Sequence, residues 1–152
     1  MSVLVEQTLA DLRSAATVRG ALRLAGGFFE HAAGNPDPSE PEVVTDPASP
    51  AELDALRDAV IDVVGAAPRS DPNLVALGLF VLGKHRDPSL IQFFVQWLVE
   101  HWRENPFATH QALIGLNNHG EPTLDLEGQL SSLDPNPTLR QAEHYLHSLK
   151  LI

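Results

Sequence analysis

Residues 71–90, DPNLVALGLFVLGKHRDPSL, hold the pattern that decides the fold. Each Asp-Pro pair fits a helix start, because the Asp side chain accepts a hydrogen bond from a free backbone N–H of the first turn. Proline loses nothing at the first helical position, since its missing N–H would be unpaired there anyway. Between the pairs, Leu74 to Leu82 is apolar nearly all round, and Gly83 fits a helix end. We therefore expect a central helix here and a second helix after Pro88.

A short polar residue followed by proline recurs along the chain and divides it into segments of helix size. From Pro72 onward these starts lie 16, 18, 16 and 15 residues apart, enough for a helix of about three turns in each interval. Apolar residues recur at helical spacing inside the segments, which predicts an all-α protein. Residues 1–33 fit either one long helix or two short ones. The pairs are Ser49-Pro50, Asp71-Pro72, Asp87-Pro88, Asn105-Pro106, Glu121-Pro122 and Asn136-Pro137.

Internal repetition extends this pattern. Shifting the chain by 34 residues aligns Asp71-Pro72 with Asn105-Pro106, Leu79 with Leu113, Leu82 with Leu116, His85 with His119, Asp87-Pro88 with Glu121-Pro122, and Leu90 with Leu124. A repeat of about this length that holds two antiparallel helices is typical of an α-solenoid. A third, shorter copy begins at Asn136.

The stretch from Val81 to Ile91, VLGKHRDPSLI, resembles the turn between the two helices of a HEAT repeat. In that turn a Leu-Gly helix end is followed by Asp-Pro and an apolar second helix. Residues 112–122 are a looser example, in a copy that has Ala108 and Thr109 where HEAT repeats usually have valine and arginine. The resemblance covers residues 71–151 and implies a short right-handed HEAT-like solenoid.

The expected organisation is a single all-α domain over residues 1–152. Residues 1–33 would form an N-terminal helical cap, residues 34–50 an acidic, proline-rich loop, and residues 51–152 the HEAT-like helix pairs.

Composition excludes several classes of protein. The chain has 152 residues and no cysteine, which rules out disulfides and thiolate metal sites. A formal net charge of −10 argues against nucleic acid, whose binding depends on phosphate neutralisation by Lys and Arg. No apolar run is long enough for a membrane span, and the N-terminal residues lack the pattern of a signal peptide. We expect a cytoplasmic protein, and the excess of arginine over lysine is typical of GC-rich bacterial genomes.

Negative charge is concentrated between residues 30 and 62, where nine acids face Arg57 alone, a net charge of −8. This segment fits either a solvated surface or a docking surface for a basic protein. Trp97 lies on a second apolar stripe beside Phe93, which either other helices or a partner must cover. The predicted partner-binding residues are Glu40, Glu42, Asp46, Asp54, Asp58, Trp97, Glu100 and Glu104.

No arrangement of residues points to catalysis, a cofactor or a metal. His144 and His147 lie one helical turn apart, but no third ligand accompanies them. Glu100, His101 and Glu104 fit the wet side of a helix, without a nucleophile or an oriented base. His85 and His119 occupy equivalent helix ends, where an imidazole interacts favourably with the helix dipole. We therefore predict no catalytic, cofactor-binding or metal-binding residues.

The predicted function is binding to another protein. HEAT-like proteins of this size and charge include bacterial immunity proteins that neutralise a cognate toxin, and the chain looks compatible with that role. The alternatives are a scaffold or adaptor subunit of a larger complex and, less favoured, a HEAT-like enzyme. Repeat-built DNA glycosylases need a basic groove, which the net charge contradicts, and nothing here marks the bilin site of a phycobilin lyase.

Overall fold

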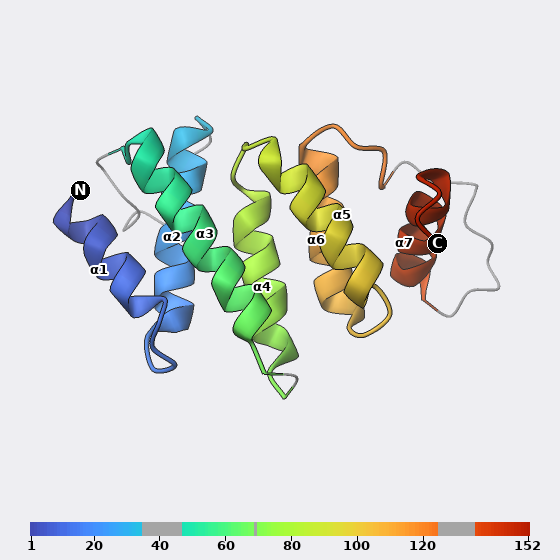
Figure 1. Ribbon diagram of the computed structural model, residues 1–152, viewed down its shortest axis with the longest axis horizontal. Coiled ribbons are helices and arrows are strands. Elements are labelled where there is room, and N and C mark those ends of the chain that lie inside the picture. The colour runs from blue at the N-terminus through green and yellow to red at the C-terminus, as the bar shows by residue number, and fades with distance from the viewer. Residues whose placement is uncertain (35–46, 69, 125–135) are drawn as a thin grey trace. The chain divides into compact units, whose positions relative to one another are not determined.

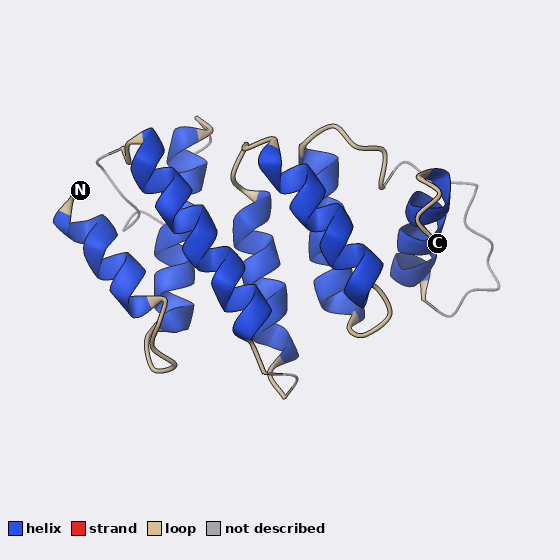
Figure 2. Ribbon diagram, in the orientation of Figure 1, coloured by secondary structure: helices blue, strands red, loops and turns tan. Residues whose placement is uncertain are grey.

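The computed structural model describes residues 1–34, 47–68, 70–124 and 136–152, and within these residues all regular structure is helical (Figure 2). The predicted all-α class is confirmed. The described residues contain seven helices: α1 (Val3–Asp11), α2 (Val18–Ala32), α3 (Pro50–Ala66), α4 (Pro72–Gly83), α5 (Ser89–His101), α6 (Pro106–Asn118) and α7 (Pro137–Ser148).

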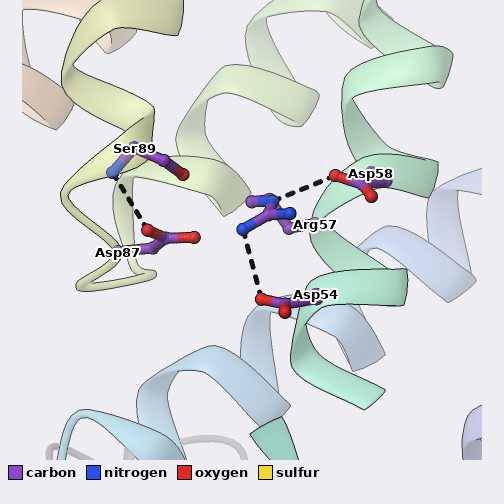
Figure 3. A network of polar contacts seen from close by, with 5 residues as sticks. All are labelled: Asp54, Arg57, Asp58, Asp87 and Ser89. Carbon is purple, nitrogen blue, oxygen red and sulfur yellow. Dashed lines mark hydrogen bonds and ion pairs between the residues drawn. The ribbon is translucent and has the colours of Figure 1, made fainter. Parts of the chain in front are cut away.

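Four of the predicted polar-Pro pairs start helices as expected. In each, the polar side chain accepts a hydrogen bond from a first-turn N–H: Ser49 from Glu52 at 3.2 Å, Asp71 from Leu74 at 3.2 Å, Asn105 from Phe107 at 3.0 Å, and Asn136 from Thr138 at 3.1 Å. At the fifth pair, Asp87 accepts from Ser89 N at 3.0 Å and α5 begins one residue later than expected (Figure 3). Each of these helix starts therefore depends on a hydrogen bond between residues at most three positions apart.

The sixth pair, Glu121-Pro122, does not start a helix directly. Residues 121–124 are not helical, and Thr123 is fully buried with its hydroxyl donating to the carbonyl of Leu113 at 2.6 Å. The Tyr145 hydroxyl donates to Glu121 Oε1 at 2.8 Å, so the carboxylate joins this segment to α7 instead of capping a helix. The predicted helix start is wrong, and the rest of that predicted helix falls on residues 125–135, outside the described residues.

The helices group into two compact units, Met1–Arg86 and Asp87–Ile152. In the first unit, α1 and α2 form one antiparallel pair and α3 and α4 another, while α1 also contacts α3, and α2 contacts both α3 and α4 (Figure 1). In the second unit, α5 and α6 are antiparallel, and α7 contacts both (Figure 1). Residues 1–33 thus form two helices. The single all-α domain over residues 1–152, with a cap, a loop and HEAT-like helix pairs, stays a prediction.

Glycine permits a close helix approach in each unit. A Cβ atom at Gly78 of α4 would lie 2.5 Å from Cγ2 of Val64 in α3, far inside normal contact distance. A Cβ at Gly115 of α6 would lie 2.5 Å from Cζ of Phe94 in α5. At both positions the missing side chain lets a side chain of the neighbouring helix pack against the glycine.

The helix α4 is buried on one side and partly exposed on the other. Leu79 and Leu82 are fully buried, in agreement with the predicted central helix. Phe80, between them, keeps 43% of its surface exposed. A helix that is apolar all round is usually covered all round. Here the cover is incomplete, because α2 and α3 contact α4 while the side that carries Phe80 remains partly open.

Candidate functional site

The helix α3 presents three carboxylates on its outer side, here called the acidic face: Asp54, Asp58 and Asp62. They follow one another at intervals of four residues, which places them along one side of the helix. The opposite side is anchored in the core of the first unit, where Leu56 and Val60 are fully buried. The acidic face therefore stands on a helix that is fixed by packing.

Arg57 organises part of this face. Its guanidinium reaches Asp54 Oδ1 at 3.2 Å through NH1 and Asp58 Oδ1 at 3.0 Å through Nε (Figure 3). The side chains of Asp54 and Asp58 remain 62% and 66% exposed. Ion pairs this exposed add little stability. Their consequence is positional, because both carboxylates are held with oxygens still accessible to a lysine or arginine of a partner.

Glu52 also belongs to the acidic segment, but it points inward. Only 9% of the residue is exposed, and its carboxylate accepts hydrogen bonds from Ser49 N at 3.0 Å and Ser2 N at 2.9 Å. The backbone N–H of Ser49, followed by that of Ser2, lowers the pKa of Glu52 to about 2. As one of the nine acids between residues 30 and 62, Glu52 would be expected on the charged surface. Instead, it joins the start of α1 to the start of α3.

Glu30 is a second acid that does not contribute a free surface charge. Its carboxylate forms an ion pair with Lys84, and its side chain is only 14% exposed. With Glu52 turned inward as well, two of the nine acids counted between residues 30 and 62 have structural roles. Of the predicted partner-binding residues in this segment, Asp54 and Asp58 are exposed, whereas Glu40, Glu42 and Asp46 lie outside the described residues.

Glu100 and Glu104 lie in the second unit, around the end of α5. Both carboxylates are exposed and flank His101, whose Nδ1 lies 3.0 Å from Glu104 Oε2 and whose Nε2 lies 3.6 Å from Glu100 Oε2. Gln96 Nε2 also donates to Glu100 at 2.8 Å. The exposure agrees with a role in partner binding. Among the described residues, no three histidine or carboxylate side chains group closely enough to hold a metal ion.

Trp97 differs from the expectation of partner contact. Only 8% of this residue is exposed, and its ring packs against that of His101 with centroids 5.4 Å apart. Trp102, which follows α5, is likewise only 9% exposed. An aromatic residue that dominates a binding surface must be accessible before the partner arrives. Trp97 is therefore covered within the protein itself, and it does not form part of an exposed partner-binding surface.

The two equivalent histidines have different surroundings. His119 follows α6, and its Nδ1 lies 2.8 Å from the carbonyl oxygen of Gly115, which agrees with the predicted role at a helix end. His85 follows α4 but stacks on Phe29 of α2, with ring centroids 4.4 Å apart and an angle of 11° between the planes. His85 is therefore part of the core of the first unit, a role that the sequence did not indicate.

The structure adds a surface that sequence reasoning missed, here called the α2–α4 hollow. It has a volume of about 300 Å³ and is lined by Arg23 and Gly26 of α2, by Leu77, Phe80 and Val81 of α4, and by Lys84. The Nζ atom of Lys84 lies 4.6 Å from the centroid of the Phe80 ring. The sequence did contain one signal for this surface. The helix α4 is apolar on every side, and its neighbours cover only part of that apolar surface.

No protein-family model matches the chain, and neither a curated protein nor a solved structure matches it at a significant level. Within the described residues, no helix combines the length and apolar character needed to cross a membrane. The candidate surfaces therefore have to be interpreted from their own chemistry.

Proposed function

We propose that the chain is a protein-binding module that inhibits a partner with a basic surface, as an immunity protein neutralises its cognate toxin. The observation that carries the proposal is the acidic face of α3, where exposed carboxylates stand on a helix with a fully buried opposite side. A field of one sign on a fixed scaffold speeds the association of an oppositely charged partner and selects against others.

The proposed architecture is a short right-handed HEAT-like solenoid acting in the bacterial cytoplasm. Three features support the solenoid: the polar-Pro helix starts, the 34-residue offset between the starts of α4 and α6, and the antiparallel pairing of successive helices within each unit. In the first unit, α1 contacts α3 and α2 contacts α4, so equivalent helices of the two pairs are neighbours. Solenoids use such stacked faces as binding surfaces.

The first test is isolation of a partner from the native host, followed by kinetics with both proteins purified. Asp54→Lys/Asp58→Lys reverses two charges on the acidic face. Glu6→Lys/Glu143→Lys makes the same change in net charge at exposed positions on α1 and α7 and serves as the matched control. At low salt, we expect the acidic-face variant to associate about tenfold more slowly than the control, and the difference to shrink at high salt.

Equal association rates for the two variants would contradict docking through the acidic face. Circular dichroism verifies that both variants are folded. The activity of the partner then separates inhibition from assembly: loss of activity in the complex supports an inhibitor, whereas full activity supports the scaffold or adaptor alternative. Turnover of nucleic acid by the purified chain, with no protein partner recovered, would support the enzyme alternative.

A further inference from the structure

The α2–α4 hollow has an apolar wall on α4, opposite the buried Gly26 of α2. Leu77, Phe80 and Val81 of α4 face a position on α2 occupied by Gly26. A Cβ atom at Gly26 would lie 3.5 Å from Val81 Cγ2 and 3.5 Å from Lys84 Cδ, so even a methyl group would occupy part of the floor without a clash. The volume of about 300 Å³ falls at the lower end of the range for ligand sites, which is about 300–1,000 Å³.

The charged residues that line the hollow are cations, although the whole protein is negatively charged. The net charge is −10, yet the two charged residues of the lining are Arg23 and Lys84. Lys84 is held by its ion pair with Glu30 and by its position over the Phe80 ring. Arg23 is exposed at the rim, and its planar guanidinium suits a carboxylate because it can donate two parallel hydrogen bonds.

An apolar wall beside an exposed arginine selects a ligand that offers an apolar side chain next to a carboxylate. Phe80 lines the hollow and is 43% exposed, so much of its ring is left to be covered, which suits a chain segment better than a small acid. The net negative charge opposes such a ligand at long range. At physiological ionic strength the Debye length is about 8 Å, so the more distant acids are screened. Glu30 already balances the charge of Lys84, which leaves Arg23 as the cation of the lining that attracts a carboxylate.

We propose that the α2–α4 hollow binds an acidic peptide segment of a partner protein, with one apolar side chain against Phe80 and Gly26 and a neighbouring carboxylate on Arg23. This site is separate in residues and opposite in charge to the acidic face. The chain would therefore have two docking surfaces in its first unit, each selecting a different chemistry.

The test uses the full chain and three fluorescein-labelled hexapeptides, DDLFEE, DDGGEE and KKLFKK, titrated by fluorescence anisotropy at physiological salt. We expect saturable binding of DDLFEE only, because that peptide alone combines the apolar and acidic groups. Equal binding of DDGGEE would mean that the site attracts any acidic peptide and does not recognise the apolar side chain. Preferential binding of KKLFKK would mean that the site selects basic and not acidic peptides. Either result overturns the proposal.

Variants locate the bound peptide. Gly26→Ala fills the floor, Phe80→Ala removes the exposed wall, and Arg23→Gln removes the rim charge. Each should weaken DDLFEE binding at least about fivefold, an effect that only a minority of interface residues reach on truncation. The matched controls are Gly20→Ala on the same helix, whose Cβ would contact nothing within 4 Å, and Arg13→Gln at another exposed arginine. Unchanged binding by Gly26→Ala, once its fold is verified, places the peptide elsewhere and refutes the site.

Two further measurements test the class of ligand and the position of the site. Competition with N-acetylleucine distinguishes a peptide site from a site for small carboxylic acids. Displacement of labelled DDLFEE by N-acetylleucine at concentrations similar to those of the peptide would overturn the peptide assignment. The variant Asp54→Lys/Asp58→Lys should bind DDLFEE at least as tightly as the wild type, because its substitutions lie on α3 and reduce the net negative charge. Weaker binding by that variant would contradict a site confined to α2 and α4.

Discussion

Replacing Gly115 by alanine adds one Cβ atom between α5 and α6 and so tests how closely these helices pack in the second unit. The added Cβ would lie 2.5 Å from Cζ of Phe94, 2.7 Å from Cε2 and 2.9 Å from Cε1. Side chains do not approach so closely, so the ring or the helix must move. Phe94 is fully buried, and the rings of Phe93 and His119 lie near its own ring, with centroids 5.7 Å and 6.4 Å away. The ring therefore has little room to turn aside.

Two opposing effects determine the magnitude. Overpacking a closely packed core costs about 1–3 kcal/mol. Replacing a helical glycine by alanine returns up to about 1 kcal/mol, because alanine has the higher helix propensity. Gly26→Ala receives the second effect without the first, since its Cβ would meet neighbours at 3.5 Å, an ordinary contact distance. We therefore expect Gly115→Ala to be less stable than Gly26→Ala by about 1–3 kcal/mol.

Urea unfolding measures both variants. Trp97 and Trp102, the two tryptophans of the chain, lie in the second unit, so their fluorescence follows the unit that contains Gly115. Far-UV circular dichroism follows the helices of both units, and linear extrapolation gives the free energy of unfolding. In a Phe94→Leu background, Gly115→Ala should no longer destabilise the protein, because the ring that it strikes is absent. Equal stability changes for the two glycine variants, or an unchanged cost in the Phe94→Leu background, would refute this packing.

Two other predictions concern the first unit. Leu79→Ala should lower its free energy of unfolding by about 2–5 kcal/mol, because Leu79 is fully buried and its truncation leaves a cavity; a near-zero change in urea unfolding would show that α4 does not carry the core. Glu52→Gln should lower the urea midpoint at pH 7, where the carboxylate of the wild type is charged and accepts two backbone hydrogen bonds. The pKa of Glu52 lies at about 2 in the fold against an ordinary value of 4.5, so the stability that it adds is present above pH 4.5 and is lost as pH falls through about 2. The gap between Glu52→Gln and wild type should therefore narrow over that range, and a gap independent of pH would contradict the assigned role.

Local signals in the sequence were sufficient for most helix starts. Asp71 and Asn105 cap helices through bonds to residues at most three positions away, so the information lies within one turn of chain. The hydrogen bonds of Glu52 could be predicted only in part from local sequence. Half of its role, the bond with Ser49, is a local capping box, but the other half depends on Ser2, which lies 50 residues earlier. Spacing alone could not have brought Ser2 and Glu52 together.

The exposed residues were harder to predict than the buried ones. Leu79 and Phe80 are neighbours on a helix that is apolar on every side, so periodicity cannot rank their burial. The placement of α2 and α3 decides that Leu79 is covered and Phe80 is not. Trp97 presents the converse case, because an aromatic stripe fits exposure and burial equally well until the neighbouring helices are placed. The candidate surfaces could therefore be predicted only in part.

The local helix caps also bear on how such a chain can evolve. Each of Ser49, Asp71, Asn105 and Asn136 bonds to an N–H within its own first turn, so each helix carries its start signal with it. Duplication or deletion of a helix pair would therefore move the pair together with its caps and leave the remaining starts intact. Gene rearrangement within such a chain could change its length by whole helix pairs, with new burial needed only at the two faces that the change brings together.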